Sequence, residues 1–177
     1  ASSVRGKGDA ATDSKTSRFS HKKTQQEMAI IGISGQFADS DNIDEFWQHI
    51  DSQTDLLKEV PSSHWDVKPW FDENFGVEDK TYCKWGSFIN GVDHFDASFF
   101  NISPREAEWI DPQLRMLLQS VYRTGEDAGV INQIRGSDTG VFVGVCFHDY
   151  ADKIAEMQQP INPLAGTGNG QTIMANR

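Results

Sequence analysis

Two helix starts lie close together near the middle of the chain. Ser103 is followed by Pro104, and Glu106 stands three residues after the serine, which is the spacing of a capping box. Asp111 repeats the arrangement with Pro112 behind it. Both sites supply a side-chain oxygen for the backbone N–H groups that a helix leaves unpaired at its start. The pattern therefore predicts two helices in quick succession.

The second of these helices carries a long apolar face. The residues that share this face at helical spacing are Leu114, Leu117, Leu118, Val121, Gly125 and Ala128. Gly129 follows at the position where a left-handed cap commonly ends a helix. We therefore expect a helix over residues 112–128 that buries one side against the core.

Two almost continuous apolar runs, at residues 28–34 and 139–145, flank the helical region. Neither run alternates with polar residues, which is typical of strands covered on both faces in a parallel sheet. Parallel neighbours need helical crossovers, and Asn42, with Glu45 at the capping-box position, begins another predicted helix. An α/β layered domain, with a mainly parallel central sheet and helices on both faces, follows from this alternation.

Charge divides the chain of 177 residues into a basic beginning and an acidic remainder. Residues 1–27 hold six Lys/Arg and three Asp/Glu, a net charge of +3. Since the whole chain has a net charge of −10, residues 28–177 carry −13. The net negative charge of residues 28–177 argues against binding to nucleic acid, whose phosphates require a basic surface. Residues 1–27 lack apolar periodicity, so we interpret them as a flexible linker or tail, and residues 28–177 as the folded part.

The cysteines and the apolar runs indicate a cytoplasmic protein. Cys83 and Cys146 lie far apart and form no Cys-x-x-Cys pair, which argues against a structural zinc site and suits a reducing compartment. No apolar run is long enough to cross a bilayer, and no signal peptide is visible at the start. The spacing of His21, His49, His64 and His94 suggests no metal site.

Aromatic residues are dense between residues 58 and 100. They are Trp65, Trp70, Phe71, Phe75, Tyr82, Trp85, Phe88, Phe95, Phe99 and Phe100. Such a stripe can form a ligand cage or a base-stacking platform. The favoured interpretation is that a long, irregular loop region uses large side chains as anchors.

Candidate chemistry is sparse. Cys146 and His148 would lie on the same side of an extended strand and could form a thiol–imidazole dyad, although catalytic pairs are usually assembled by the fold. The glycines at 32–35 and 166–170 match no phosphate-binding fingerprint, so turns and close packing explain them better. Glu106, Glu108 and Asp111 stabilise helix starts and need no other role.

The last segment is expected to be a turn at residues 166–170, followed by the beginning of a helix at residues 171–177. No cap or breaker follows this second pattern. We therefore expect an incomplete fold.

Several blocks resemble the β-ketoacyl synthase domain of modular polyketide synthases. The run from Ser103 to Glu108 and the Asp111-Pro-Gln113 triplet match the "SPREAE" and "DPQ" motifs of this family. Further blocks in the family's order are Ile30–Phe37, Asn42–Trp47, Val60–Asp66, Lys84–Ile89, Val92–Phe100, Glu126–Gly129, Thr139–Val145 with Asp149-Tyr150, Thr167–Asn169 and Ala175–Arg177. Departures include Gln36, Ala38 and Leu114, where the family more often has Arg, Pro and Gln.

The resemblance implies the first, N-terminal half of a thiolase-like fold. In this family a later cysteine accepts an acyl chain from the 4'-phosphopantetheine of an acyl carrier protein, and two later histidines assist decarboxylative condensation with a malonyl-type extender. None of these three residues is present, so no catalytic residue is assigned, and we expect the isolated chain to be inactive. We expect no directly bound cofactor or metal.

The family resemblance also implies partners and a candidate surface. The partners are the remaining C-terminal part of the ketosynthase, a carrier protein and, for the complete domain, a second copy in a homodimer. Candidate acyl-channel or dimer-interface residues are Thr167, Asn169, Thr172 and Met174, for which ordinary helix packing is an equally good interpretation. The alternative is a non-catalytic ketosynthase remnant that serves as a docking or scaffold module.

Overall fold

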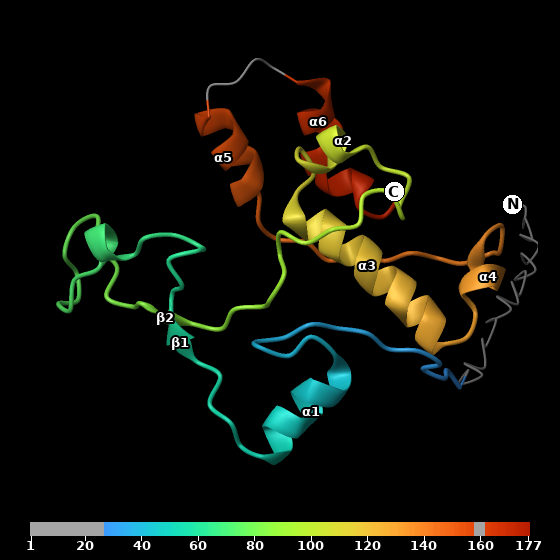
Figure 1. Cartoon of the computed structure of the whole chain (residues 1–177), viewed down its shortest axis with the longest axis horizontal. Coiled ribbons are helices and arrows are strands. Elements are labelled where there is room, and N and C mark those ends of the chain that lie inside the picture. Colours follow the sequence, from blue (N-terminus) through green and yellow to red (C-terminus); the bar gives the residue numbers. More distant parts are fainter. Residues whose placement is uncertain (1–26, 158–161) are drawn as a thin grey trace, which may run out of the picture.

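The computed structural model describes residues 27–157 and 162–177, so the predicted tail lies outside the described residues except for Glu27. Figure 1 shows the elements along the chain. The helices are α1 (Ile43–Asp51), α2 (Pro104–Ala107), α3 (Pro112–Asp127), α4 (Ile131–Ile134), α5 (Asp149–Glu156) and α6 (Pro163–Asn169). The short strands are β1 (Lys58–Glu59) and β2 (Trp85–Gly86), and the 3₁₀ turns are η1 (Lys68–Trp70) and η2 (Gln171–Ile173).

The predicted helix caps are confirmed. The side chain of Asn42 accepts the hydrogen bond from the backbone N–H of Glu45 at the start of α1. Ser103 caps α2 in the same way, and Asp111 caps α3. Gly129 follows α3 with a φ of +69°, a left-handed conformation that glycine adopts without steric cost.

The core lies where α2 meets α3. Ile110 and Leu114 are almost completely buried, with 0% and 1% of their surface exposed. The other members of the buried cluster are Ala97, Ile102, Ala107 and Met174. Burying a large aliphatic side chain stabilises a fold by about 1.5–3 kcal/mol. The start of α3 is therefore the best-packed point among the described residues, and Met174 brings the end of the chain to it.

The two apolar runs predicted as parallel strands lie as extended chain beside α3. Neither residues 28–34 nor residues 139–145 form a strand within the described part, whose sheet is the antiparallel β1–β2 pair. The side chains of Val143 and Val145 pack against the core. Ile30 and Phe142 are 89% and 97% exposed. The predicted parallel sheet is thus not assembled, because each run contacts the helix without a neighbouring strand to pair its backbone.

The first apolar run is fixed at the C-terminal end of α3. The backbone N–H of Ile33 donates to a carboxylate oxygen of Asp127 at 2.8 Å. A Cβ on Gly32 would lie 2.6 Å from the carbonyl oxygen of Thr124, so only glycine fits this approach. The close packing predicted for this glycine is therefore confirmed.

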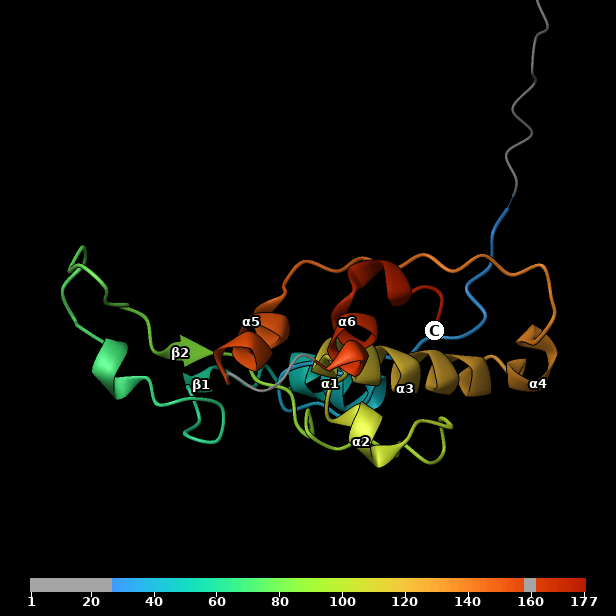
Figure 2. The same cartoon turned by 90° about the horizontal axis from the view of Figure 1, so that it is seen from above.

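The aromatic region is largely irregular, as predicted, but it is less well anchored than expected. Phe95 and Phe100 pack against the core. Six of the ten aromatic side chains are instead exposed: Trp65, Trp70, Phe75, Tyr82, Trp85 and Phe99. Figures 1 and 2 both show the segment between β1 and β2 projecting away from α3. The expectation that these rings serve as buried anchors is wrong for that segment.

The last segment differs from its prediction. Residues 166–169 belong to α6, which begins with an Asn162 cap and Pro163, and they do not form a turn. The predicted helix start at residue 171 is a single 3₁₀ turn, η2. In the described residues, no helix is both long and apolar enough to traverse a bilayer.

Candidate functional site

The turn between α2 and α3, residues 108–111, receives hydrogen bonds from distant parts of the chain. We call these residues the α2–α3 turn. The Tyr150 hydroxyl at the start of α5 donates to the carbonyl oxygen of Glu108 at 2.6 Å. Carbonyl groups at the end of a helix lack partners within it, so this bond satisfies one of them. It fixes the start of α5 against the end of α2.

Helix α6 packs against the same turn. The Asn169 amide donates to the carbonyl oxygen of Trp109 at 2.9 Å, and it also bonds Ala165 within α6. The backbone N–H of Asp111 donates to the carbonyl oxygen of Gly168 at 3.0 Å. Figure 1 shows α2, α5 and α6 gathered at the first turn of α3. An ion pair between Arg177 and Glu106 adds a connection from the end of the chain to α2.

The side chain of Gln113 connects this turn to the segment that follows the second apolar run. Its amide nitrogen lies 3.3 and 3.2 Å from the two carboxylate oxygens of Asp111. The same nitrogen donates to the carbonyl oxygen of Phe147 at 3.2 Å. Asp111 is only 4% exposed, and its carboxylate also accepts the backbone N–H of Gln113 at 2.8 Å. Hydrogen bonds to a carboxylate are stronger than those between two neutral groups, so Asp111 is the main partner that orients the Gln113 side chain.

A cavity of about 310 Å³ lies along α3 between the two apolar runs, and we call it the α3 groove. One wall is formed by residues 34–36 and the other by residues 143–145. The floor and ends are lined by Gln113, Met116, Leu117, Ser120, Arg123 and Met174. The lining combines apolar side chains, such as Met116 and Met174, with the charged Arg123.

The candidate residues from the sequence lie in two environments. Met174 is buried at 7% exposure in the core, and Asn169 bonds to the α2–α3 turn, so both take part in packing. Thr167 and Thr172 are exposed, and the Thr167 hydroxyl donates to the carbonyl oxygen of Leu164. A role for these four residues in an acyl channel or a dimer interface stays a prediction. Sequence reasoning missed Gln113 and Tyr150 as connecting residues, although both lie in blocks that carry the family resemblance.

The Cys146–His148 pair has no catalytic geometry. Both side chains are exposed, and among the described residues no hydrogen bond joins them. His148 stands at the N-cap position of α5. The described part of the chain also contains no group of three or more His, Cys, Asp or Glu arranged to hold a metal ion.

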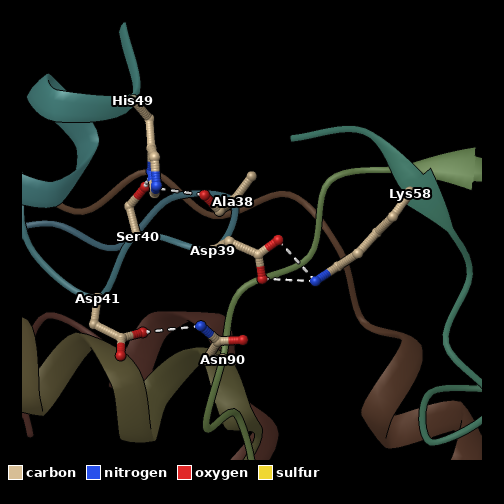
Figure 3. A network of polar contacts seen from close by, with 7 residues as sticks. All are labelled: Ala38, Asp39, Ser40, Asp41, His49, Lys58 and Asn90. Atoms are coloured by element: carbon tan, nitrogen blue, oxygen red, sulfur yellow. Dashed lines mark hydrogen bonds and ion pairs between the residues drawn. The ribbon is translucent and has the colours of Figure 1, made fainter. Parts of the chain in front are cut away.

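A separate polar network holds the turn at residues 38–40, as Figure 3 shows. The Ser40 hydroxyl, in a residue only 1% exposed, lies 2.8 Å from Nδ1 of His49 and donates to the carbonyl oxygen of Ala38 at 3.0 Å. Lys58 binds both carboxylate oxygens of Asp39, at 2.6 and 2.8 Å. This turn therefore binds α1 and β1 at once, and we interpret the network as structural.

The pKa values of two groups outside the groove are displaced. The pKa of Asp72 lies below its ordinary value because the backbone N–H and then the side-chain amide of Asn74 donate to the carboxylate. The pKa of Tyr122 is raised, chiefly by its hydrogen bond with Glu126. Both arise from local partners and indicate no acid–base site.

Comparison with known proteins gives a consistent result. The model of the family described as "Beta-ketoacyl synthase, N-terminal domain" matches residues 25–177. Polyketide synthase PksL of Bacillus subtilis (strain 168) is 44% identical over 164 residues, which is 88% of this chain and 4% of that protein. Polyketide synthase ThaG of Burkholderia thailandensis is 40% identical over 169 residues, 95% of this chain and 3% of that protein.

Solved structures agree. The oxazolomycin ketosynthase domain OzmH KS7 of Streptomyces albus JA3453 has a TM-score of 0.56 and 37% identity, over 58% of this chain and 18% of that chain. The ketosynthase from module 6 of the bacillaene synthase of Bacillus subtilis 168 has a TM-score of 0.53 and 40% identity, over 57% and 17%. The predicted thiolase-like fold class is thereby confirmed, and the chain spans under a fifth of these structures.

Proposed function

This chain belongs to the β-ketoacyl synthase family, and we propose that it forms the scaffold of the first part of a chain-elongating ketosynthase domain in a polyketide synthase. The observation that carries the proposal is the convergence at the α2–α3 turn. Residues from the "DPQ", "DY" and "TGN" blocks (Asp111, Tyr150 and Asn169) all bond at this turn. These three blocks therefore hold α3, α5 and α6 together.

In the proposed reaction, a cysteine thiolate outside this sequence attacks an acyl thioester and releases the thiol of a carrier protein's phosphopantetheine arm. A malonyl-type extender then loses CO₂, and the resulting enolate attacks the enzyme-bound acyl group, which frees the cysteine. Cysteine reactivity of this kind requires a thiolate, and donors must stabilise the developing negative charge. Cys83 and Cys146 are exposed free thiols, and we assign neither of them this role.

The proposal implies partners, because this chain supplies scaffold and the reactive cysteine comes from another part of the ketosynthase. The remainder of the ketosynthase would cover residues 28–34 and 139–145, whose exposed apolar side chains, on backbone that joins no sheet in the described residues, suit strand addition. A carrier protein would deliver the acyl chain, and the complete domain would act as a homodimer. We place this assembly in the cytoplasm, where thiols such as Cys83 and Cys146 stay reduced.

The test is acyl transfer with and without the missing part. The 177-residue chain is incubated with an acyl-phosphopantetheine thioester, alone and after refolding with a polypeptide that supplies the remaining ketosynthase sequence of PksL. Mass spectrometry then locates the acyl group. We expect no acylation of the chain alone, and acylation of a cysteine of the added polypeptide in the complex.

Two outcomes would contradict the proposal. Acylation of Cys146 in the isolated chain would favour the thiol–imidazole hydrolase or transferase. A stable complex that never becomes acylated, while the intact PksL ketosynthase does, would favour a non-catalytic docking module.

A further inference from the structure

The segment between Val145 and Tyr150 has few anchors of its own. Val145 packs against the core on one side, and the Tyr150 hydroxyl bonds to Glu108 on the other. Between them, Cys146 and His148 are exposed, and the side chain of Phe147 is 65% exposed. These side chains therefore contribute little packing that would hold the backbone in place.

The amide of Gln113 supplies the anchor that this segment lacks. It donates to the backbone carbonyl of Phe147, at the midpoint of the segment, from the first turn of α3. Its own position is set by the buried carboxylate of Asp111, which binds both the backbone N–H and the side-chain amide of Gln113. Figure 1 shows the segment that leads into α5 passing α3 near the start of that helix.

The same contact bears on the α3 groove. Gln113 lines the groove, and residues 143–145, which end two residues before Phe147, form one of its walls. Fixing the backbone at Phe147 would limit how far residues 143–145 can move relative to residues 34–36. Loss of the anchor would release the backbone at Phe147 while leaving Val145 as the nearest packed side chain.

We propose that Gln113 is a positioning residue that fixes residues 146–148, and with them one wall of the α3 groove, through its hydrogen bond to the Phe147 carbonyl. This contact is independent of the condensation proposed above. It holds whatever the groove binds, and its test uses no enzymatic activity.

The test reads the mobility of the segment directly. A nitroxide is attached to Cys146 in a Cys83→Ser background, and its electron paramagnetic resonance spectrum is recorded. Gln113→Met keeps the length of the side chain but removes the donor. We expect the mobile component to rise about three- to tenfold relative to the held component, the change that loss of one such hydrogen bond produces.

The chain offers a matched control on the same helix. Gln119 also donates its side-chain amide to a backbone carbonyl, that of His94, at 3.2 Å. Gln119→Met should leave the Cys146 spectrum unchanged. A nitroxide on Cys83 in a Cys146→Ser background should be insensitive to Gln113→Met, since that site lies in the segment between β1 and β2.

Two more variants separate anchoring from general stability. Gln113→Asn keeps an amide near Asp111 but is too short to reach Phe147, so it should release the segment as Gln113→Met does. Gln113→Lys restores a donor and should return the spectrum toward that of the unaltered chain. An unchanged spectrum in both Gln113→Met and Gln113→Asn, an equal response to Gln119→Met, or failure of Gln113→Lys to restore the held component would overturn the proposal.

Discussion

Gly168 lies so close to Trp109 that a Cβ at this position would stand 2.4 Å from the Trp109 carbonyl oxygen. The same Cβ would come to 3.0 Å from the Cα of Ile110, the most deeply buried residue of the core. Because both neighbours are backbone atoms, they cannot turn aside as a flexible side chain can. The contact between α6 and the α2–α3 turn therefore depends on a glycine.

Gly168→Ala should destabilise the fold by about 1–3 kcal/mol, the usual cost of forcing extra volume into a packed site. Urea unfolding followed by circular dichroism measures the change. Gly166→Ala is the matched control in the same helix, because a Cβ added there would meet no atom within 4 Å. That control should be neutral or gain up to about 1 kcal/mol from the better helix propensity of alanine. Equal losses in both variants would contradict the packing argument.

Asp111→Ala should cost about 2 kcal/mol or slightly more, at the upper end for an N-cap, since the carboxylate is buried and also binds the Gln113 amide. Asp111→Asn keeps an acceptor for the backbone N–H of Gln113 and should cost clearly less. Asn42→Ala removes the exposed cap of α1 and serves as the comparison, with an expected loss of about 0.5–1 kcal/mol. The free energies come from the same unfolding assay, and an Asp111→Ala loss below that of Asn42→Ala would be unexpected.

Tyr150→Phe removes the hydrogen bond to the Glu108 carbonyl and should destabilise the fold by about 0.5–1.5 kcal/mol. Hydrogen exchange of the α5 amides, measured by mass spectrometry, should accelerate because α5 loses its attachment to the end of α2. Tyr82→Phe is the control, since Tyr82 is 61% exposed and packs edge-to-face on Phe75. Its exchange pattern should not change in α5.

The Ser40 hydroxyl has one proton to donate, and the Ala38 carbonyl accepts at 3.0 Å, so we expect Nδ1 of His49 to be the donor to the Ser40 oxygen. Neutral His49 should therefore carry its proton on Nδ1, which ¹⁵N chemical shifts of the imidazole detect. Ser40→Ala should abolish this preference and cost about 1–3 kcal/mol, because it leaves polar groups at a buried site without a partner. A neutral Nε2–H form in the unaltered chain would show that the network is arranged differently.

Local signals in the sequence predict the helices well, and non-local contacts explain where they fail. The caps at Asn42, Ser103 and Asp111 and the glycine at 129 act within a few residues, so sequence reasoning finds them. The glycines of residues 166–170 point to a turn, yet Asn162, Pro163 and the contact with Trp109 favour a helix there.

The strands and the candidate site depend on partners that are distant in sequence. An apolar run such as residues 139–145 has the composition of a buried strand, but a ladder needs a second backbone beside it. The convergence at the α2–α3 turn joins Glu108 to Tyr150 and Trp109 to Asn169, and no local pattern encodes such pairs. Only the family resemblance marked these blocks as belonging together.

The exposed extended runs have a consequence for how such a chain behaves in a cell. Ile30 and Phe142 stand on backbone that offers its N–H and C=O groups to any strand that approaches. A polypeptide in this condition is prone to aggregate with other copies of itself. During synthesis on the ribosome, early packing of further sequence onto these two runs would therefore favour correct folding of the nascent chain over aggregation.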